Sequence, residues 1–170
     1  TVGFVSEYFK TGMPLISKRI TVDGNAVLFP KNLRAPIGAR ICDIIEHCGG
    51  YTKPPKKILM GGPMMGRAIY NHEKALIKNN NAILVFDKEK ASFPEESDCI
   101  RCGSCFRSCP LNLMPTEIEK EYHLANIEGL KKLKVSMCME CGCCSYVCPA
   151  KKQLSMINRL AKRMVQEGKK

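Results

Sequence analysis

The order of apolar and polar residues in the first half of the chain predicts short strands gathered around one helix. Apolar and polar residues alternate from Ile16 to Val22, and Asp23-Gly24 supplies a turn directly after them, so this stretch is expected to be a strand. Residues 27–29 are expected to be its hairpin partner. The remaining strands are expected at residues 32–36, 57–60, 68–70 and 82–86.

A helix is expected at residues 38–49 because apolar residues recur there at helical spacing. These residues are Ile41, Ile44, Ile45 and Cys48. Gly49-Gly50 then ends the helix. Cys48 is therefore expected to be a core residue. Cys42 and His47 are expected to have packing or surface roles, since neither has partners at ligand spacing.

The second half of the chain predicts helices rather than strands. Pro115 and Thr116 are expected to open a helix, in which Thr116 and Glu119 have the spacing of a capping box, and this helix is expected to end at Gly129. After Pro149, an amphipathic helix is expected, with its basic residues mostly facing outward. The expected buried stripe of this last helix is Leu154, Ile157, Leu160, Ala161 and Met164.

A charged segment that contains Pro94 separates the two halves, so the chain is expected to be an α+β protein with two domains. The expected parts are an N-terminal helix and linker at 1–14, a small α+β domain at 15–87, a linker at 88–98, a cysteine-rich helical domain at 99–150 and a basic amphipathic helix at 151–170.

Eight of the eleven cysteines form two copies of one pattern. In each copy two residues lie between the first and second cysteines and two between the second and third. Three residues lie between the third and the fourth, and a proline follows directly. The first copy is Cys99, Cys102, Cys105 and Cys109, and the second is Cys138, Cys141, Cys144 and Cys148. Bacterial ferredoxins bind 4Fe–4S clusters with this run, in which three closely spaced thiolates wrap three corners of one cluster.

In two-cluster ferredoxins the fourth cysteine of each run ligates the cluster of the other run. The first cluster is therefore expected on Cys99, Cys102, Cys105 and Cys148. The second cluster is expected on Cys138, Cys141, Cys144 and Cys109. Such crossed ligation joins the two runs and brings the clusters close enough to exchange electrons. Cys143, the extra thiol beside Cys144, is expected to be a spectator.

Zinc ribbons and disulfide frameworks also use paired cysteines, but both fit this pattern less well. Zinc needs four ligands and does not explain the third cysteine and the Cys-Pro ending of each copy. Disulfide frameworks are typical of secreted proteins. The sequence shows no signal peptide and no apolar run as long as a membrane span. The cysteines are therefore expected to be reduced metal ligands in the cytoplasm.

The chain is basic, with a formal net charge of +11 at pH 7. Much of this charge lies at residues 151–170, where seven basic residues stand against Glu167. They are Lys151, Lys152, Arg159, Lys162, Arg163, Lys169 and Lys170. This stretch fits an anionic membrane surface, an acidic partner or a solvated helix face. Nucleic acid is not expected as a partner, because no recognition motif accompanies the charge.

The sequence resembles the family of C subunits of the Rnf electron-transport complex, called RnfC or RsxC. The segments that carry the resemblance are KILMGGPMMG at 57–66, NAILVF at 81–86, CIRCGSCFRSCPLNLMP at 99–115 and CMECGCCSYVCPAK at 138–151. The resemblance covers nearly all of the chain. It implies that the first domain is an SLBB-type β-grasp domain, and that the second is a two-cluster ferredoxin domain. The implied function is electron relay in an NAD/ferredoxin oxidoreductase that acts as an ion translocase.

The resemblance also implies cofactors and partners. The cofactors are two 4Fe–4S clusters, and the partners are the other Rnf subunits, membrane subunits included. The implied location is the cytoplasmic face of the cell membrane, with peripheral rather than integral attachment. The family carries a region that binds FMN and NADH ahead of the β-grasp domain, and nothing precedes Thr1 here. FMN binding and NADH dehydrogenase activity are therefore not expected from this chain alone.

Two rival functions stay open. One is the electron-transfer part of an RnfC-like corrinoid (cobalamin) reductase, which shares the layout of the two domains. The other is a non-redox docking scaffold in which clusters or zinc only join the two runs. If the chain relays electrons, Arg101, Arg107 and Lys151 are expected to stabilise the reduced clusters, and Glu140 and Asp98 to oppose reduction.

Overall fold

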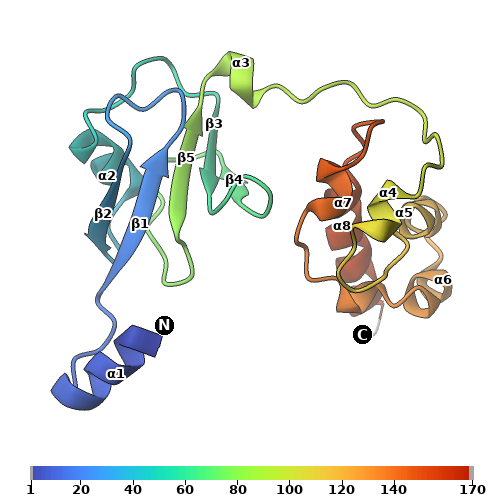
Figure 1. Cartoon of the computed structure of the whole chain (residues 1–170), viewed down its shortest axis with the longest axis horizontal. Helices are drawn as coiled ribbons and strands as arrows, with labels where there is room; N and C mark the ends of the chain where they lie inside the picture. The colour runs from blue at the N-terminus through green and yellow to red at the C-terminus, as the bar shows by residue number, and fades with distance from the viewer. Residues whose placement is uncertain (1, 169–170) are drawn as a thin grey trace. The chain divides into compact units, whose positions relative to one another are not determined.

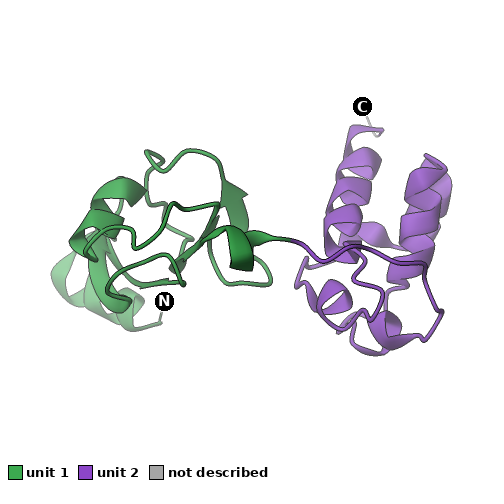
Figure 2. Cartoon of the chain, turned by 90° about the horizontal axis from the view of Figure 1, so that it is seen from above, with its two compact units in different colours: residues 1–92 green, residues 93–170 purple. Residues whose placement is uncertain are grey.

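The structure of the chain is a computed structural model that describes residues 2–168, so Thr1, Lys169 and Lys170 lie outside the description. The chain divides into two compact units, residues 1–92 and residues 93–170, which Figure 2 colours separately. Within the described range, no helix is long and apolar enough to cross a membrane.

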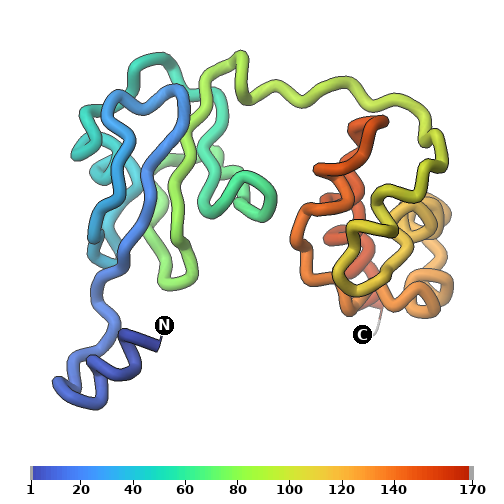
Figure 3. Tube along the Cα trace, in the orientation of Figure 1, coloured from blue at the N-terminus to red at the C-terminus, as the bar shows by residue number. Residues whose placement is uncertain are grey.

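Unit 1 is built on a five-stranded mixed sheet (Figure 1). Its strands are β1 (Ser17–Asp23), β2 (Lys31–Pro36), β3 (Lys57–Met60), β4 (Arg67–Ile69) and β5 (Ala82–Phe86). In the sheet they lie side by side in the order β2-β1-β5-β3-β4. The tube in Figure 3 shows the path of the chain through them in sequence order, from β1 to β5. Strand β1 pairs antiparallel with β2 and parallel with β5. This β-grasp arrangement confirms the implied fold, and all but one of the expected strands fall on these five.

The core of unit 1 joins the sheet to helix α2 (Ile41–His47). Ile20 and Val22 are buried between exposed neighbours on β1, because successive side chains of a strand point to opposite faces. The same core contains Ile41, Ile44, Ile45, Ile83 and Val85. Cys48 is fully buried among them, as expected. Each large aliphatic side chain buried here contributes about 1.5–3 kcal/mol to folding.

The expectation of a hairpin partner at residues 27–29 is wrong. Val27 forms only an isolated bridge, and β2 pairs with β1 instead. The cause is the turn at Gly24, whose φ of 122° favours glycine and where a Cβ would overlap the carbonyl of Val85. The N–H of Ala26 donates to that carbonyl at 3.3 Å. The chain is thus bound to β5 after the turn, and the antiparallel strand begins several residues later.

Two helices of unit 1 contribute little to this core. Helix α1 (Val2–Thr11) buries none of its residues. Helix α3 (Lys88–Ala91) forms inside the stretch expected to be a linker, and the carboxylate of Asp87 caps it by accepting from the N–H of Lys90 at 3.1 Å. Hydrogen bonding with Asn25 and with the Lys90 N–H lowers the pKa of Asp87 to about 2. The cap therefore remains ionised at neutral pH.

Unit 2 is helical. Its elements are α4 (Ser104–Arg107), α5 (Pro115–His123), α6 (Ile127–Lys132), the 3₁₀ turn η1 (Val135–Met137), α7 (Cys143–Tyr146) and α8 (Leu154–Glu167). Helix α8 packs against α5 and α6. The core between these helices consists of Leu113, Ile118, Leu130, Val135, Ala161 and Val165.

The capping box expected at Thr116 is wrong. The N-cap of α5 is Met114, Pro115 occupies the first turn, and no side chain caps the helix. Proline suits this position because its missing N–H would have no partner inside the helix. Glu119 does not reach back to the N-cap but forms an ion pair with Lys152, with 2.9 Å between Oε1 and Nζ.

The end of α5 and the buried side of α8 also differ from the expectation. Gly129 lies inside α6, and Ala125, at a φ of 51°, lies between α5 and α6 instead. The buried side chains of α8 are Leu154, Asn158, Ala161 and Val165. The other expected members of the stripe, Ile157, Leu160 and Met164, are only half-buried. The buried side of α8 thus contains an asparagine that a search for apolar residues does not find.

Candidate iron–sulfur sites

The two cysteine runs fold into the same loop. Three residues of each run adopt the left-handed backbone conformation at equivalent positions, namely Arg101, Gly103 and Asn112 in the first and Glu140, Gly142 and Lys151 in the second. In each run a four-residue helix, α4 or α7, follows the glycine. Alternation of right- and left-handed residues turns backbone N–H groups into a concavity that suits an anionic ligand. Both loops are therefore shaped for the same kind of group.

Four cysteines border one cavity of unit 2, which we call site 1. They are Cys99, Cys102, Cys105 and Cys148, three from the first run and one from the second. Cys99 and Cys102 are exposed, whereas Cys105 and Cys148 are buried. The Oγ of Ser104 lies 3.3 Å from the Sγ of Cys102, and this hydrogen bond lowers the pKa of Cys102. Burial raises the pKa of Cys105.

The other four cysteines of the two runs border a narrower cavity, which we call site 2. They are Cys109, Cys138, Cys141 and Cys144, three from the second run and one from the first. Cys144 is buried and the other three are half-buried. Burial raises the pKa of Cys144 to about 12. At neutral pH this thiol stays protonated unless a cation such as iron compensates the charge of its thiolate.

The chemistry of both donor sets fits a 4Fe–4S cluster, since each cavity presents four thiols and cysteine thiolates are the ligands of such clusters. Between residues 2 and 168, no three His, Cys, Asp or Glu side chains lie close enough together to share a single metal ion. The four thiolates of a 4Fe–4S cluster bind four different iron atoms and are spaced more widely. The division of the cysteines between the two cavities is the one expected from crossed ligation. Ligation itself by these eight residues stays a prediction.

Leu154 lies between the two sites. It is fully buried at the start of α8 and packs with Cys105 of site 1 and Cys144 of site 2. Its side chain also borders the cavity of site 1. An apolar side chain thus fills part of the space between the two sets of cysteines.

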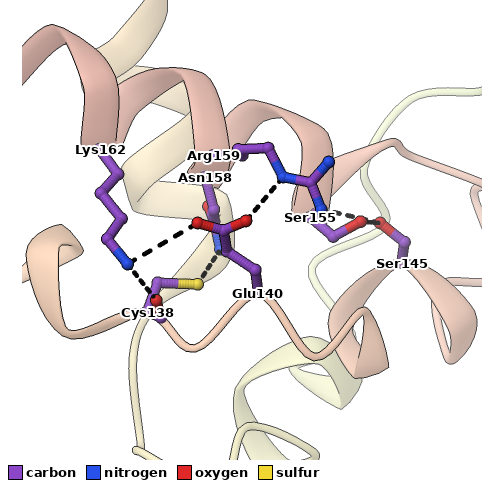
Figure 4. Close-up of polar contacts among 7 residues, drawn as sticks. All are labelled: Cys138, Glu140, Ser145, Ser155, Asn158, Arg159 and Lys162. Carbon is purple, nitrogen blue, oxygen red and sulfur yellow. Dashed lines mark hydrogen bonds and ion pairs between the residues drawn. The ribbon is translucent and has the colours of Figure 1, made fainter. Parts of the chain in front are cut away.

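Helix α8 contacts the loop of site 2 through three polar side chains (Figure 4). The Nδ2 of Asn158 lies 3.9 Å from the Sγ of Cys138, and the Nζ of Lys162 donates to the carbonyl of Cys138 at 2.8 Å. The Nε of Arg159 donates to a carboxylate oxygen of Glu140 at 2.7 Å. Arg159 and Lys162 therefore face Glu140 and do not form the outward basic face that was expected.

A different ion pair flanks site 1. Glu119 borders the cavity. The Nζ of Lys152 lies 2.9 Å from the Oε1 of Glu119 and 3.9 Å from the Oε2 of Glu96. The hydrogen bond with Glu119 raises the pKa of Lys152. Lys152 is thus a third member of the basic stretch that forms an ion pair within unit 2.

Sequence reasoning missed Asn158, Leu154 and Glu119 as parts of the two sites. Asn158 was detectable in principle, because it lies four residues after Leu154 and three before Ala161, on one side of the helix. Cys143 lies beside Cys141, and a hydrogen bond with Cys141 raises its pKa. The role of Cys143 as a spectator stays a prediction.

Known protein families match both units. Residues 19–68 match the SLBB domain, and residues 93–149 match the 4Fe-4S dicluster domain. The second match agrees with the cysteine chemistry of unit 2, and the first with the β-grasp sheet of unit 1.

Curated relatives are C subunits of ion-translocating complexes. The chain is 40% identical over 122 residues to the C subunit of the ion-translocating oxidoreductase complex of Rhodobacter capsulatus, across 72% of this chain and 24% of the relative. It is 40% identical over 112 residues to the C subunit of the proton-translocating ferredoxin:NAD(+) oxidoreductase complex of Clostridium ljungdahlii, across 66% of this chain and 24% of the relative. The C subunit of the ion-translocating oxidoreductase complex of Methanosarcina acetivorans is 34% identical over 165 residues, across 97% of this chain and 37% of the relative.

The chain spans between 24% and 37% of the length of these three relatives. Within that span it carries an SLBB domain and a 4Fe-4S dicluster domain, and its identity to them lies between 34% and 40%. The chain is therefore similar to one part of the C subunits of ion-translocating oxidoreductase complexes.

Proposed function

We propose that the chain relays single electrons through two 4Fe–4S clusters as part of an ion-translocating oxidoreductase complex. One cluster binds to the cysteines of site 1 and the other to those of site 2. The observation that supports this most is that each cavity gathers three cysteines from one run and the fourth from the other. Zinc ribbons do not require this crossing, whereas two-cluster ferredoxins do.

When bound, a 4Fe–4S cluster takes up and gives back one electron at a time. The residues of the chain hold and tune it. The left-handed loops direct backbone N–H groups inward, where they stabilise negative charge. Leu154 excludes water between the sites, and the contacts of α8 with Cys138 and Glu140 fix the loop of site 2.

We further propose that the chain acts at the cytoplasmic face of the cell membrane, attached to membrane subunits without spanning the bilayer itself. The names of its relatives support assembly into a multi-subunit complex. Two of them, from Clostridium ljungdahlii and Acetobacterium woodii, name ferredoxin:NAD(+) oxidoreductases, coupled to protons and to Na(+) respectively.

Anaerobic purification followed by metal and sulfide analysis tests the relay. The expected result is about eight iron atoms and about eight inorganic sulfides per chain, with two clusters that become paramagnetic on dithionite reduction. Bound zinc and a sample without a signal in electron paramagnetic resonance would instead support the docking scaffold. Genes for corrinoid enzymes beside this gene, rather than genes for membrane Rnf subunits, would favour the corrinoid reductase.

A further inference from the structure

Asn158 occupies an unusual position for an amide side chain. It is only 2% exposed, on the buried side of α8. Burial of an amide costs free energy unless its N–H groups and its oxygen find hydrogen-bond partners. Within the part of the chain that the structure describes, its Oδ1 has no such partner. Its Nδ2 is directed at the Sγ of Cys138, 3.9 Å away (Figure 4).

The direction of this amide suits a thiolate. An amide nitrogen only donates hydrogen bonds, whereas an amide oxygen only accepts them and would repel a negatively charged sulfur. A leucine of similar size would fill the same space without the cost of a buried polar group. What the asparagine adds is therefore a hydrogen-bond donor at the cavity of site 2, which Asn158 borders.

Two cations on α8 add to this effect. Lys162 donates to the carbonyl of Cys138 at 2.8 Å, and Arg159 holds Glu140 at 2.7 Å. The carboxylate of Glu140 is thus neutralised beside the sulfurs of site 2. At site 1, by contrast, the side-chain hydrogen bond of a cysteine is the one that the Sγ of Cys102 donates to the Oγ of Ser104, inside the loop itself.

We propose that Asn158 raises the reduction potential of the cluster in site 2. This inference rests on the proposed function, because it requires a cluster bound to Cys138. Reduction adds one electron and thereby negative charge to the cluster, so an N–H group directed at a ligand sulfur stabilises the reduced form more than the oxidised form. Burial of site 2 acts in the opposite direction, since a low-dielectric environment disfavours added charge. Asn158 is a positioning residue that acts through Cys138 and offsets this effect of burial.

The test replaces Asn158 with leucine in the whole chain and measures both midpoint potentials in an anaerobic titration with dithionite, followed by electron paramagnetic resonance. For one cluster we expect the ratio of oxidised to reduced form at a fixed potential to rise about tenfold, equivalent to about 59 mV for a one-electron couple. The other cluster is expected to keep its midpoint. Asn158→Asp keeps the size of the side chain but places a carboxylate at the sulfur, so it is expected to lower the same midpoint further.

Marker variants assign the shifted signal. Cys102→Ser changes the signal of site 1 and Cys141→Ser that of site 2, and the shift is expected in the signal that Cys141→Ser changes. Val165→Ala is the matched control, because it loosens the packing of the same helix without removing a hydrogen-bond donor, and it is expected to leave both midpoints in place.

Three outcomes separate the possibilities. Unchanged midpoints in both Asn158 variants, with full iron content, overturn this inference and leave the proposed function intact. Loss of site 2 iron from both variants also overturns it, because Asn158 would then be a requirement for assembly. A wild-type protein without reducible clusters overturns the proposed function itself.

Discussion

Sites 1 and 2 share one loop conformation but have different surroundings. Site 1 leaves Cys99 and Cys102 exposed next to Ile100, which is 68% exposed. Site 2 keeps its cysteines half-buried or buried, and α8 contacts its loop through Asn158, Arg159 and Lys162. The repeated spacing thus specifies the shape of the loop, whereas the electrostatics of site 2 also depend on residues of α8, outside the repeat.

This difference implies two ways to stabilise added charge. At site 1, water reaches two of the cysteines and can solvate a reduced cluster directly. At site 2 less water is available, and donors and cations from α8 take its place. Variants that act on one site and not on the other therefore test whether the comparison is correct.

The largest expected effect comes from removing the fourth cysteine of each run. Cys148→Ala is expected to lose the cluster of site 1, and Cys109→Ala that of site 2, so each variant should retain about half of the iron. Iron analysis and electron paramagnetic resonance are the measurements, and Cys99→Ala and Cys138→Ala show which signal belongs to which site. Cys143→Ser is the control with full iron content. If Cys109→Ala removed the signal that Cys99→Ala removes, ligation would be uncrossed.

Truncation of Leu154 is expected to affect both sites together. Leu154→Ala leaves a cavity between Cys105 and Cys144, and such a change in a packed core costs about 2–5 kcal/mol of folding free energy. Anaerobic thermal unfolding and the rate of iron loss in air measure the effect, with both clusters expected to be lost faster. Leu124→Ala, at a position that is 65% exposed, is the control and is expected to change little. Loss from only one site would show that Leu154 does not join them.

The sequence was sufficient to predict the strands of the β-grasp sheet, because β1 alternates apolar and polar residues and β3 and β5 are short apolar runs. It was also sufficient to predict which cysteines share a cavity, since the spacing and the family of two-cluster ferredoxins carry that information. The prediction of a hairpin partner at residues 27–29 was wrong, because the contact of Gly24 with β5 joins residues far apart in the chain and the local pattern does not show it. The position of Asn158 on the buried side of α8 was detectable, but its contact with Cys138, 20 positions away, was not.

Ion pairs were the feature that the sequence predicted least well. The basic residues after Pro149 read as a charged face, yet Lys152 and Arg159 each contact a glutamate that precedes the helix in the chain. The number of charged residues does not show which of them form ion pairs, because pairing depends on how the helices pack. Lys152 and Arg159 therefore belong to ion pairs within unit 2.

The smallest expected effect comes from removing one cation at each site. Lys152→Met leaves Glu119, 8% exposed at the edge of site 1, without its nearest cation, and such an unsatisfied group costs about 1–3 kcal/mol. In Arg159→Met, Glu140 keeps a second cation, because the Nζ of Lys162 lies 3.7 Å from its Oε1. The folding free energy is therefore expected to fall by about 1 kcal/mol or less. Anaerobic unfolding and iron release to a chelator measure both effects, with site 1 more affected by the first variant and site 2 by the second. Equal loss of iron from both sites in either variant would mean that the ion pairs stabilise unit 2 as a whole. The two sites would then differ only in their exposure and in the contact of Asn158.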